Sequence, residues 1–307
     1  MSATHVGTRD WSSLLGYFYV VTAGVLWGLQ WPMSRFCQAQ DVPPLEIAFW
    51  RACIGGGCFL LHAQVTRRLT VRLRHLPIFC LFGVYAMGMQ FAILQIAVRE
   101  SGAALSSVLL YSAPVWVAIF SRLLFKETLS RVKLTALVIA IAGVAMICLS
   151  GGSLADKRPS TLGIGLGLLS GFVYASASIF FVLWKDRYST STIYAYMLLS
   201  GALALLPFVD VSPAKSAAAW GGLLVMGVLT CYGAFFAYGQ SLRFISPVRV
   251  AIFCNLEPVV GTILCWLCWD ESFPPIGWLG SALVIAAIIS LAREGKNPTS
   301  RPLESER

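Results

Sequence analysis

The sequence predicts an all-α integral membrane protein of ten transmembrane helices, arranged as two inverted five-helix repeats with both termini inside. Three observations predict this fold: a very apolar composition, ten long apolar runs, and a sequence repeat that spans five of these runs. Hydrophobic residues make up 57% and charged residues 12% of the 307 residues, and the mean hydropathy is +0.75. Soluble domains carry about 25% charged residues, so this chain lacks the polar side chains that a soluble surface needs.

Each predicted span is an apolar run bounded by charge or proline, and the hydrocarbon core requires about 20 helical residues. Because lipid offers no partners for backbone N–H and C=O groups, runs of this length must be helices rather than barrel strands. In the sixth span, the consecutive GxxxG spacings of Gly163, Gly167 and Gly171 predict a close-packing surface. The spans cover about residues 14–34, 44–63, 76–98, 102–125, 132–150, 162–184, 192–209, 219–242, 247–269 and 275–292.

The Lys and Arg residues give the orientation of the spans, because cytoplasmic loops carry an excess of both. With the N-terminus inside and the spans alternating, 17 of the 23 Lys and Arg residues fall inside and five fall outside. Arg51 is left within the second span. This bias predicts an even number of spans and both termini in the cytoplasm, so the expected location is the bacterial inner (plasma) membrane.

The two halves of the sequence carry the same spaced residues. Pro114 and Glu127 in the fourth span and its exit are 13 positions apart, as are Pro258 and Glu271 in the ninth. An odd number of spans per repeat inverts the second copy, which is an architecture of secondary transporters. Further pairs, at offsets of 144 or 147, are Gly83 with Gly227, Arg99 with Arg243, Gly24 with Gly171 and Trp27 with Tyr174.

The repeat divides the chain into five expected segments. One chain holds both half-sites, so we expect a functional monomer, with a dimer left open. Each half should supply five helices, and little of the chain remains for extramembrane domains. The segments are a cytoplasmic N-terminus at 1–13, the first repeat at 14–150, an external linker at 151–161, the second repeat at 162–293 and a cytoplasmic tail at 294–307.

These residues together resemble the drug/metabolite transporter superfamily, and within it the ten-span EamA-domain exporters of aromatic amino acids and other metabolites. The resemblance covers nearly the whole chain. It implies export of small metabolites, including amino acids, through a central cavity lined by spans 1, 3, 4, 6, 8 and 9. The residues that carry it are Trp27-Gly28, Phe49-Trp50-Arg51, Pro114 to Glu127, Gly143-Val144, Leu256-Glu257-Pro258 to Glu271, and Gly277 to Gly280.

Two charged residues lie inside predicted spans, where a charge costs about 2.5–3.5 kcal/mol on insertion scales. Glu257 is about halfway along the ninth span, beside Pro258, which removes a helix hydrogen bond. A carboxyl group there fits a proton-coupling site, a counter-charge for an amine substrate, or a structural role beside the kink. Arg51 is about seven residues from the outer end of the second span, so it either extends to the interface or contributes charge to the site. Pro114 predicts an equivalent kink in the fourth span.

Polar and aromatic side chains on the cavity spans are the candidates for substrate binding, since a pocket for an organic solute is mostly apolar with a few placed polar groups. Each aromatic residue has an alternative interpretation as a packing or interface residue. The expected lining residues are Trp27, Gln30, Trp31, Tyr85, Gln90, Gln95, Tyr111, Tyr174, Ser178, Tyr232, Gln240, Asn255 and Glu257.

The sequence predicts neither enzyme chemistry nor a cofactor. Cys265 and Cys268 have the spacing of half a metal site, but no second half completes it, and no metal site is expected. No phosphate-binding loop or hydrolase motif is present. The net charge is +9, but the sequence has no basic cluster interleaved with exposed aromatic residues, so nucleic acid is not an expected partner. The expected partners are a small-molecule substrate and membrane lipids.

The function that fits these observations is secondary transport. We expect a transporter that exports small organic metabolites, amino acids or related amines, across the inner membrane by alternating access. Uniport and proton coupling both remain open. The alternatives are a membrane channel and a non-transporting membrane receptor or scaffold; a channel is disfavoured because no ring or filter of repeated charges occurs.

Overall fold

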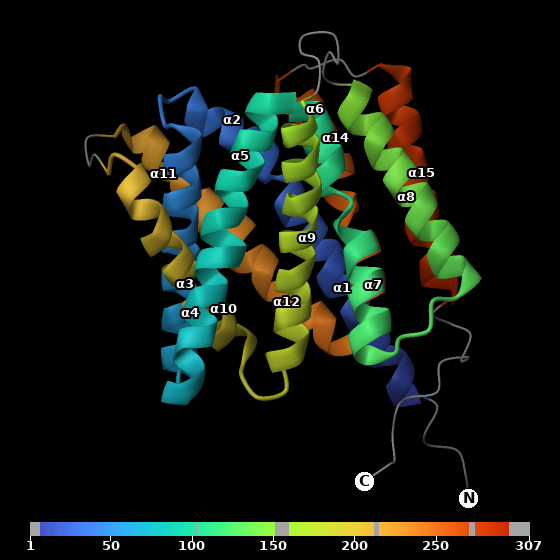
Figure 1. Ribbon diagram of the computed structural model, residues 1–307, viewed down its shortest axis with the longest axis horizontal. Helices are drawn as coiled ribbons and strands as arrows, with labels where there is room; N and C mark the ends of the chain where they lie inside the picture. The colour runs from blue at the N-terminus through green and yellow to red at the C-terminus, as the bar shows by residue number, and fades with distance from the viewer. Residues whose placement is uncertain (1–6, 102, 151–159, 212–214, 270–273, 295–307) are drawn as a thin grey trace, which may run out of the picture.

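The computed structural model describes residues 7–101, 103–150, 160–211, 215–269 and 274–294, and these residues form a bundle of helices (Figure 1). In the first half, the helices are α1 (Gly7–Gly28), α2 (Gln30–Gln38), α3 (Pro44–Val65), η1 (Leu73–His75), α4 (Leu76–Gly83), η2 (Val84–Met89), α5 (Gln90–Ser101), α6 (Ala103–Leu110), α7 (Ala113–Phe125) and α8 (Arg131–Ser150). In the second half, they are α9 (Thr161–Trp184), α10 (Thr190–Leu205), η3 (Leu206–Phe208), α11 (Ala217–Val225), η4 (Met226–Gly233), α12 (Ala234–Phe244), α13 (Pro247–Cys254), α14 (Leu256–Trp269) and α15 (Pro275–Glu294).

Nine helical stretches among the described residues are long and apolar enough to cross a membrane. The remaining expected span, the third along the chain, is formed by α4, η2 and α5. Its first part lies within Leu73–Met89, a shorter apolar helix that continues into α5. The prediction of an all-helical membrane protein is therefore confirmed. Of the expected segments 1–13, 151–161 and 294–307, residues 1–6, 151–159 and 295–307 lie outside the described residues, as does Glu271. The helix α1 begins at Gly7, within the segment expected to be a cytoplasmic N-terminus.

Two spans are broken at matching positions of the two repeats. The fourth span is divided between α6 and α7 at Tyr111, and the ninth between α13 and α14 at Asn255, 144 positions later. Pro114 and Pro258 follow the two breaks. A proline has no N–H for the hydrogen bond that an unbroken helix would make at that position, and it disfavours helical geometry in the residue before it. The kinks predicted at both prolines are thus present as interruptions of the helix.

The third and eighth spans share another irregularity. Each contains a π-helical turn, η2 at Val84–Met89 and η4 at Met226–Gly233, and the two overlap at the offset of 144. The first span does not follow the symmetry, because α1 and α2 are interrupted at Leu29 whereas α9 runs without a break from Thr161 to Trp184. The backbone is therefore duplicated in most spans but not at Leu29.

The packing of the helices has the same two-fold pattern. α1 packs against α12, α13 and α14, and α9 packs against α5, α6 and α7, which are the corresponding elements of the other repeat. α3 packs against α10, and α8 against α15, so each of these helices meets its own counterpart. Figure 1 shows the α8–α15 pair at one side of the bundle and α3, α10 and α11 at the other.

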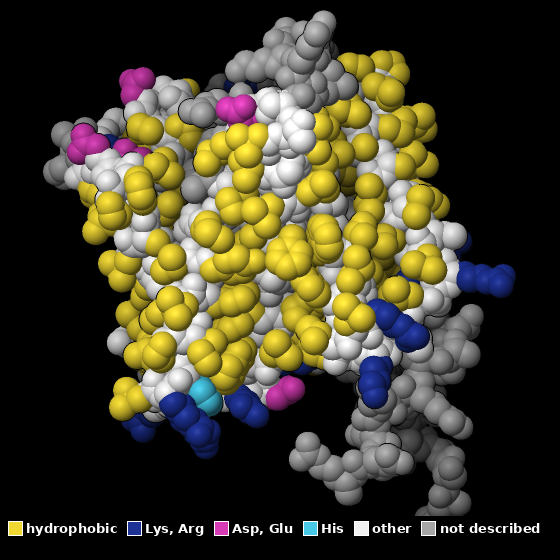
Figure 2. All heavy atoms as spheres, in the orientation of Figure 1, with side chains coloured by type: hydrophobic (Ala, Val, Ile, Leu, Met, Phe, Trp, Pro, Cys, Tyr) yellow, Lys and Arg dark blue, Asp and Glu magenta, His cyan; other side chains and the backbone are white. Residues whose placement is uncertain are grey.

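Figure 2 shows how the surface fits a membrane. Hydrophobic side chains cover the middle of the visible face, Lys and Arg gather toward the end where α7 ends, and most visible Asp and Glu lie at the opposite end. Exposed large hydrophobic residues occur on nearly every long helix. An apolar belt with cations at one end is the distribution that the count of Lys and Arg predicts. We call the cation-rich end the basic end.

Glycines allow the closest helix contacts. A Cβ atom at Gly143 of α8 would lie 2.6 Å from the backbone oxygen of Gly280 in α15, and one at Gly280 would lie 2.5 Å from the oxygen of Gly143. Gly163, Gly167 and Gly171 of α9 likewise face the chain from Glu100 to Ser112 at short range. The stripe predicted from the GxxxG spacing is therefore a close-packing surface.

Replacing Gly143 with alanine should destabilise the bundle. The added methyl group would have to displace backbone, and such overpacking costs about 1–3 kcal/mol, against about 1 kcal/mol gained in helix propensity. The matched control is Gly165→Ala, because no atom lies within 4 Å of a Cβ at Gly165. Thermal unfolding in detergent should give a lower midpoint for Gly143→Ala than for wild type, with Gly165→Ala unchanged or higher. Equal midpoints for the two variants would contradict the close contact of α8 with α15.

Candidate functional site

The candidate site is centred on Glu257, in the first turn of α14. Its side chain is buried, with 8% of the residue exposed. A carboxylate in the first turn of a helix is stabilised by the partial positive charge of the helix N-terminus. The break at Asn255 creates this N-terminus within the span, so the irregular backbone supports the buried charge.

Gln30 supplies the direct hydrogen bond to this carboxyl group. Its Nε2 donates to Oε1 of Glu257 at 2.6 Å, and Gln30 is the first residue of α2. Gly28 allows this approach, because a Cβ there would lie 2.6 Å from Cβ of Val260 and 3.1 Å from the backbone oxygen of Glu257. The interruption at Leu29 therefore coincides with the point where the first span meets α14.

Three further side chains interact with Glu257. Tyr111 lies at the break of the fourth span, so the two broken spans contribute to the same cluster. Trp31 also interacts with the carboxyl group, packs on Gly261 and remains 42% exposed. Arg51 of α3 lies beside Cys231 and is near enough for its charge to act on Glu257. Arg51 thus contributes positive charge to the interior cluster.

Of the three buried side-chain amide atoms that make no hydrogen bond among the described residues, two belong to residues of this cluster. They are Oε1 of Gln30 and Nδ2 of Asn255, and Asn255 is only 1% exposed. Leaving a buried donor or acceptor unsatisfied costs about 1–3 kcal/mol. Since one atom is an acceptor and the other a donor, the cluster has polar capacity of both kinds that its own residues do not use.

An aromatic group lies against this cluster. Trp27 is 2% exposed, and its ring centroid lies 5.3 Å from that of Phe235 and 5.2 Å from that of Tyr238. Ser178 hydrogen-bonds Tyr238. Tyr174 is close enough to Tyr238 and Glu257 for electrostatic interaction with both. Trp27, Tyr174 and Ser178 are therefore brought together around Tyr238, and Tyr174 connects this group with Glu257.

Among the described residues, the contacts of the other predicted residues do not include Glu257. Tyr85 is within hydrogen-bonding distance of Ser176, whose Oγ lies 3.4 Å from the Tyr85 hydroxyl. Tyr232 pairs with Nδ1 of His62 at 2.8 Å. Oε1 of Gln90 is buried without a partner, and the side chain of Gln95 lies outside the described part of the chain.

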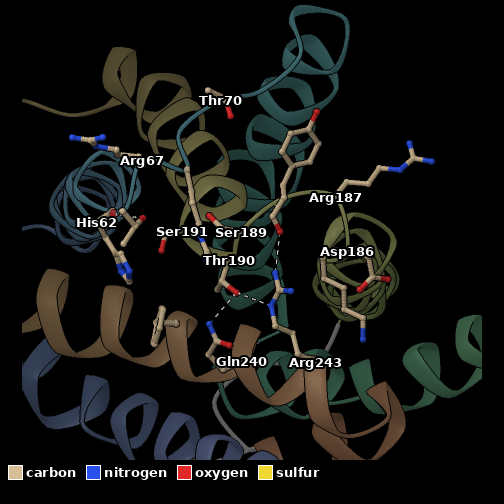
Figure 3. A pocket seen from close by; sticks show the side chains of 15 residues that line it. His62, Arg67, Thr70, Asp186, Arg187, Ser189, Thr190, Ser191, Gln240 and Arg243 are labelled. Atoms are coloured by element: carbon tan, nitrogen blue, oxygen red, sulfur yellow. Dashed lines mark hydrogen bonds between the residues drawn. The ribbon is translucent and has the colours of Figure 1, made fainter.

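Gln240 is part of a different site. Its Nε2 donates to Oγ1 of Thr190 at 3.3 Å, in a pocket of the basic end (Figure 3). Arg243 and His62 line the same pocket. The twelve expected lining residues whose side chains the structure describes thus divide among an interior cluster, scattered positions and this pocket.

Tyr238 and Tyr194 complete the aromatic group, although neither was among the expected lining residues. Tyr238 is 5% exposed and Tyr194 3%, and both rings lie near 5 Å from an aromatic neighbour of the group, Tyr238 from Trp27 and Tyr194 from Phe235. Tyr238 is on the eighth span, which was expected to line the cavity, so only its position along the helix could have indicated it. Tyr194 is on the seventh span, and no sequence signal singled it out.

Comparisons with known proteins agree with this fold. The model of the EamA-like transporter family matches residues 14–149 and 161–293. The chain is 25% identical to the uncharacterized transporter YdfC of Bacillus subtilis over 271 residues, which covers 86% of each chain. It is 22% identical to the uncharacterized inner membrane transporter YicL of Salmonella typhimurium, covering 93% of this chain and 97% of that one.

A more specific name belongs to another relative. A probable terminal-alkyne amino-acid exporter of Streptantibioticus cattleyicolor is 22% identical over 226 residues, covering 72% of this chain and 75% of that one. A crystal structure with a TM-score of 0.77 and 17% identity covers 94% of this chain and 100% of its own, which shows a shared fold. Since the family model matches both halves of the chain, this protein belongs to the EamA-like transporter family and is a multi-pass membrane transporter rather than an enzyme.

Proposed function

We propose that the chain exports small organic metabolites that carry an amino group, amino acids or related amines, across the inner membrane by alternating access. The single observation that carries the proposal is the buried Glu257 with unused polar capacity beside it. An ammonium group requires acceptors, which the Glu257 carboxylate and Oε1 of Gln30 supply. A substrate carboxylate requires donors, and Nδ2 of Asn255 supplies one.

The surroundings of Glu257 suit an organic solute. Trp27 and Tyr238, which are buried, and Tyr174, which is partly buried, provide aromatic surface beside the polar cluster. A pocket for a small organic molecule is mostly apolar, with a few polar groups that fix the orientation of the ligand. The name of the relative from Streptantibioticus cattleyicolor supports an amino-acid substrate and an outward direction.

The helix breaks support transport by alternating access. Secondary transporters place substrate sites at discontinuous helices near the interface of two repeats, and one repeat then moves against the other. Here the breaks at Tyr111 and Asn255 belong to different repeats. Tyr111, at the first break, interacts with Glu257, which follows the second break by two residues. A carboxyl group at this interface would be exposed to each side in turn.

Efflux from proteoliposomes tests the substrate class. Vesicles are loaded with amino acids, polyamines and organic acids without an amino group, and mass spectrometry identifies the compounds that leave. We expect selective loss of amine-bearing solutes, and a rate reduced about tenfold or more by Glu257→Gln, since a hydrogen bond to a charged group contributes about 1.5–3 kcal/mol.

The control for that substitution is Glu46→Gln. Glu46 is also buried, at 4% exposure, but its partners differ from those of Glu257, because it pairs with Lys215 at 2.5 Å and accepts from Trp50 at 3.1 Å. Efflux by the folded Glu46→Gln variant should equal the wild-type rate. Selective loss of solutes without an amino group would contradict the proposed substrate class.

Asn255→Leu separates amino acids from simple amines. The substitution removes the unused donor while keeping a similar volume, so solutes with a carboxylate should lose more efflux than polyamines, by about fivefold or more for one neutral donor to a charged group. The measurement is the ratio of initial efflux rates for the two solute classes in wild type and variant. An unchanged ratio would remove Asn255 as the carboxylate contact.

The pH dependence of efflux reports on the charge of Glu257. Protonation removes the counter-charge for an ammonium group, so wild-type efflux should fall as the loading side is acidified, whereas Glu257→Gln should give a flat profile. Rates are measured at matched pH on both sides and then with a pH gradient, which separates uniport from proton coupling. A variant that retains the wild-type pH profile would exclude Glu257 as the coupling site.

A further inference from the structure

A second pocket lies at the basic end, away from Glu257. It is enclosed by the end of α3 with the segment after it, the loop from α9 to α10, and α12. Its volume is about 580 Å³, which lies in the range of about 300–1,000 Å³ for sites that hold small organic ligands. Figure 3 shows Gln240 and Arg243 of α12 facing Thr190 at the start of α10.

Positive charge dominates this pocket. Among its described lining residues, five are Arg or Lys, and the only carboxylate is Asp186. Like charges brought together in a pocket repel one another and raise the local concentration of anions. The five cations are Arg67, Arg68, Lys185, Arg187 and Arg243.

Arg243 is fixed at the pocket wall. Its Nη2 donates to the backbone oxygen of Tyr188 at 2.9 Å, and its Nε donates to Oγ1 of Thr190 at 3.3 Å, as the dashed lines in Figure 3 show. The guanidinium carbon lies 5.9 Å from the ring centroid of Phe181. These hydrogen-bond and ring partners are all uncharged. The charge of Asp186 acts favourably on Arg243 and that of Arg68 acts against it, so one carboxylate faces five cations in the pocket.

Lys185 is placed in a similar way. Its Nζ donates to the backbone oxygen of Leu242 at 2.6 Å. Burial lowers the pKa of the Lys185 ammonium group, an effect that Asp186 opposes and the charge of Arg243 increases. A bound anion would favour the charged form of this lysine, because an opposite charge nearby stabilises the protonated ammonium.

Arg67 occupies a backbone position that favours glycine. Its φ is 53°, in the left-handed region, where residues other than glycine are uncommon. The turn ends α3 with two hydrogen bonds, from the N–H of Arg67 to the oxygen of Gln64 and from the N–H of Arg68 to the oxygen of Ala63. This is the helix ending in which glycine is usual, yet here the residue carries a cation that lines the pocket.

We propose that this pocket binds a phosphate group, either the headgroup phosphate of an anionic phospholipid or a soluble phosphate. The bias of cations toward the cytoplasmic side explains why Lys and Arg are numerous at this end, but not why two of them are fixed by backbone oxygens inside one cavity. Basic pockets between membrane helices on this side are suited to lipid headgroups. This site is independent of the proposed amine substrate, because Glu257 does not line the pocket and because the pocket is positively charged, whereas Glu257 supplies a negative charge.

Calorimetric titration of the purified full-length chain in nonionic detergent, at constant ionic strength, tests the proposal. The probes are dihexanoyl-phosphatidylglycerol, dihexanoyl-phosphatidylcholine and inorganic phosphate. Binding of phosphatidylglycerol but not phosphatidylcholine would identify a lipid headgroup site, and binding of inorganic phosphate with comparable affinity would identify a soluble anion. Equal binding of the two lipids, or no binding of any probe, would overturn the proposal.

Two variants localise the binding. Arg243→Gln should weaken it about tenfold or more, as expected for loss of a hydrogen bond from a charged donor. Arg67→Gly should weaken it about threefold, in the range of an exposed ion pair, while relaxing the backbone at positive φ. Because glycine suits that position, Arg67→Gly keeps the test decisive if Arg243→Gln does not fold.

Lys126→Gly is the matched control for Arg67→Gly. Lys126 also has a positive φ, 54°, and ends α7 at the basic end, but it does not line the pocket. The two substitutions therefore remove the same charge and relieve the same kind of backbone conformation. Binding by Lys126→Gly should stay within about twofold of wild type, since removal of a remote exposed charge has little effect at moderate salt. Equal weakening by both variants would indicate general attraction to the basic end and overturn the proposed site.

Discussion

The structure of the interior depends on one constraint: within a membrane, a broken helix must satisfy its free backbone groups against protein or a cavity. The breaks at Tyr111 and Asn255 meet this constraint by lying in the middle of the bundle, where spans of both repeats pack around them. The break in the ninth span creates a helix N-terminus, and the carboxyl group of Glu257 occupies its first turn. The position of the polar cluster is thus a consequence of where the helices are interrupted.

Duplication determines the backbone more closely than it determines the chemistry. The breaks and the π-helical turns recur at an offset of 144, but Tyr111 corresponds to Asn255, and Ala113 corresponds to Glu257. The interruption at Leu29, which places Gln30 beside Glu257, has no counterpart in α9. The backbone around the two breaks is therefore duplicated, but the carboxylate of Glu257 and its partner Gln30 occur in one copy each. The charge at the centre of the bundle thus does not follow the two-fold symmetry of the repeats.

Much of the fold was predictable because hydropathy, proline and the distribution of cations act over whole spans. Ten spans, the kinks at Pro114 and Pro258, and the glycine stripe of α9 needed no knowledge of side-chain direction. The site was less predictable, since apolar residues surround these helices on all sides and give no periodic signal for the inward face. For that reason Gln30 and Gln240 looked equivalent in the sequence, although one contacts Glu257 and the other contacts Thr190.

The Lys and Arg residues at the basic end are of two kinds, exposed cations and cations that backbone oxygens hold in place. Exposed residues such as Arg122 can satisfy their charge with water, and their number is enough to orient a chain in the membrane. Arg243 and Lys185 are instead partly buried and bonded to backbone oxygens, which supply hydrogen-bond partners but no opposite charge. Orientation alone does not require this arrangement, because a cation on a flexible exposed loop would serve equally well. The two hydrogen bonds join the loop between α9 and α10 to α12, and they hold two cations at the wall of one pocket, which is the arrangement that the proposed phosphate site requires.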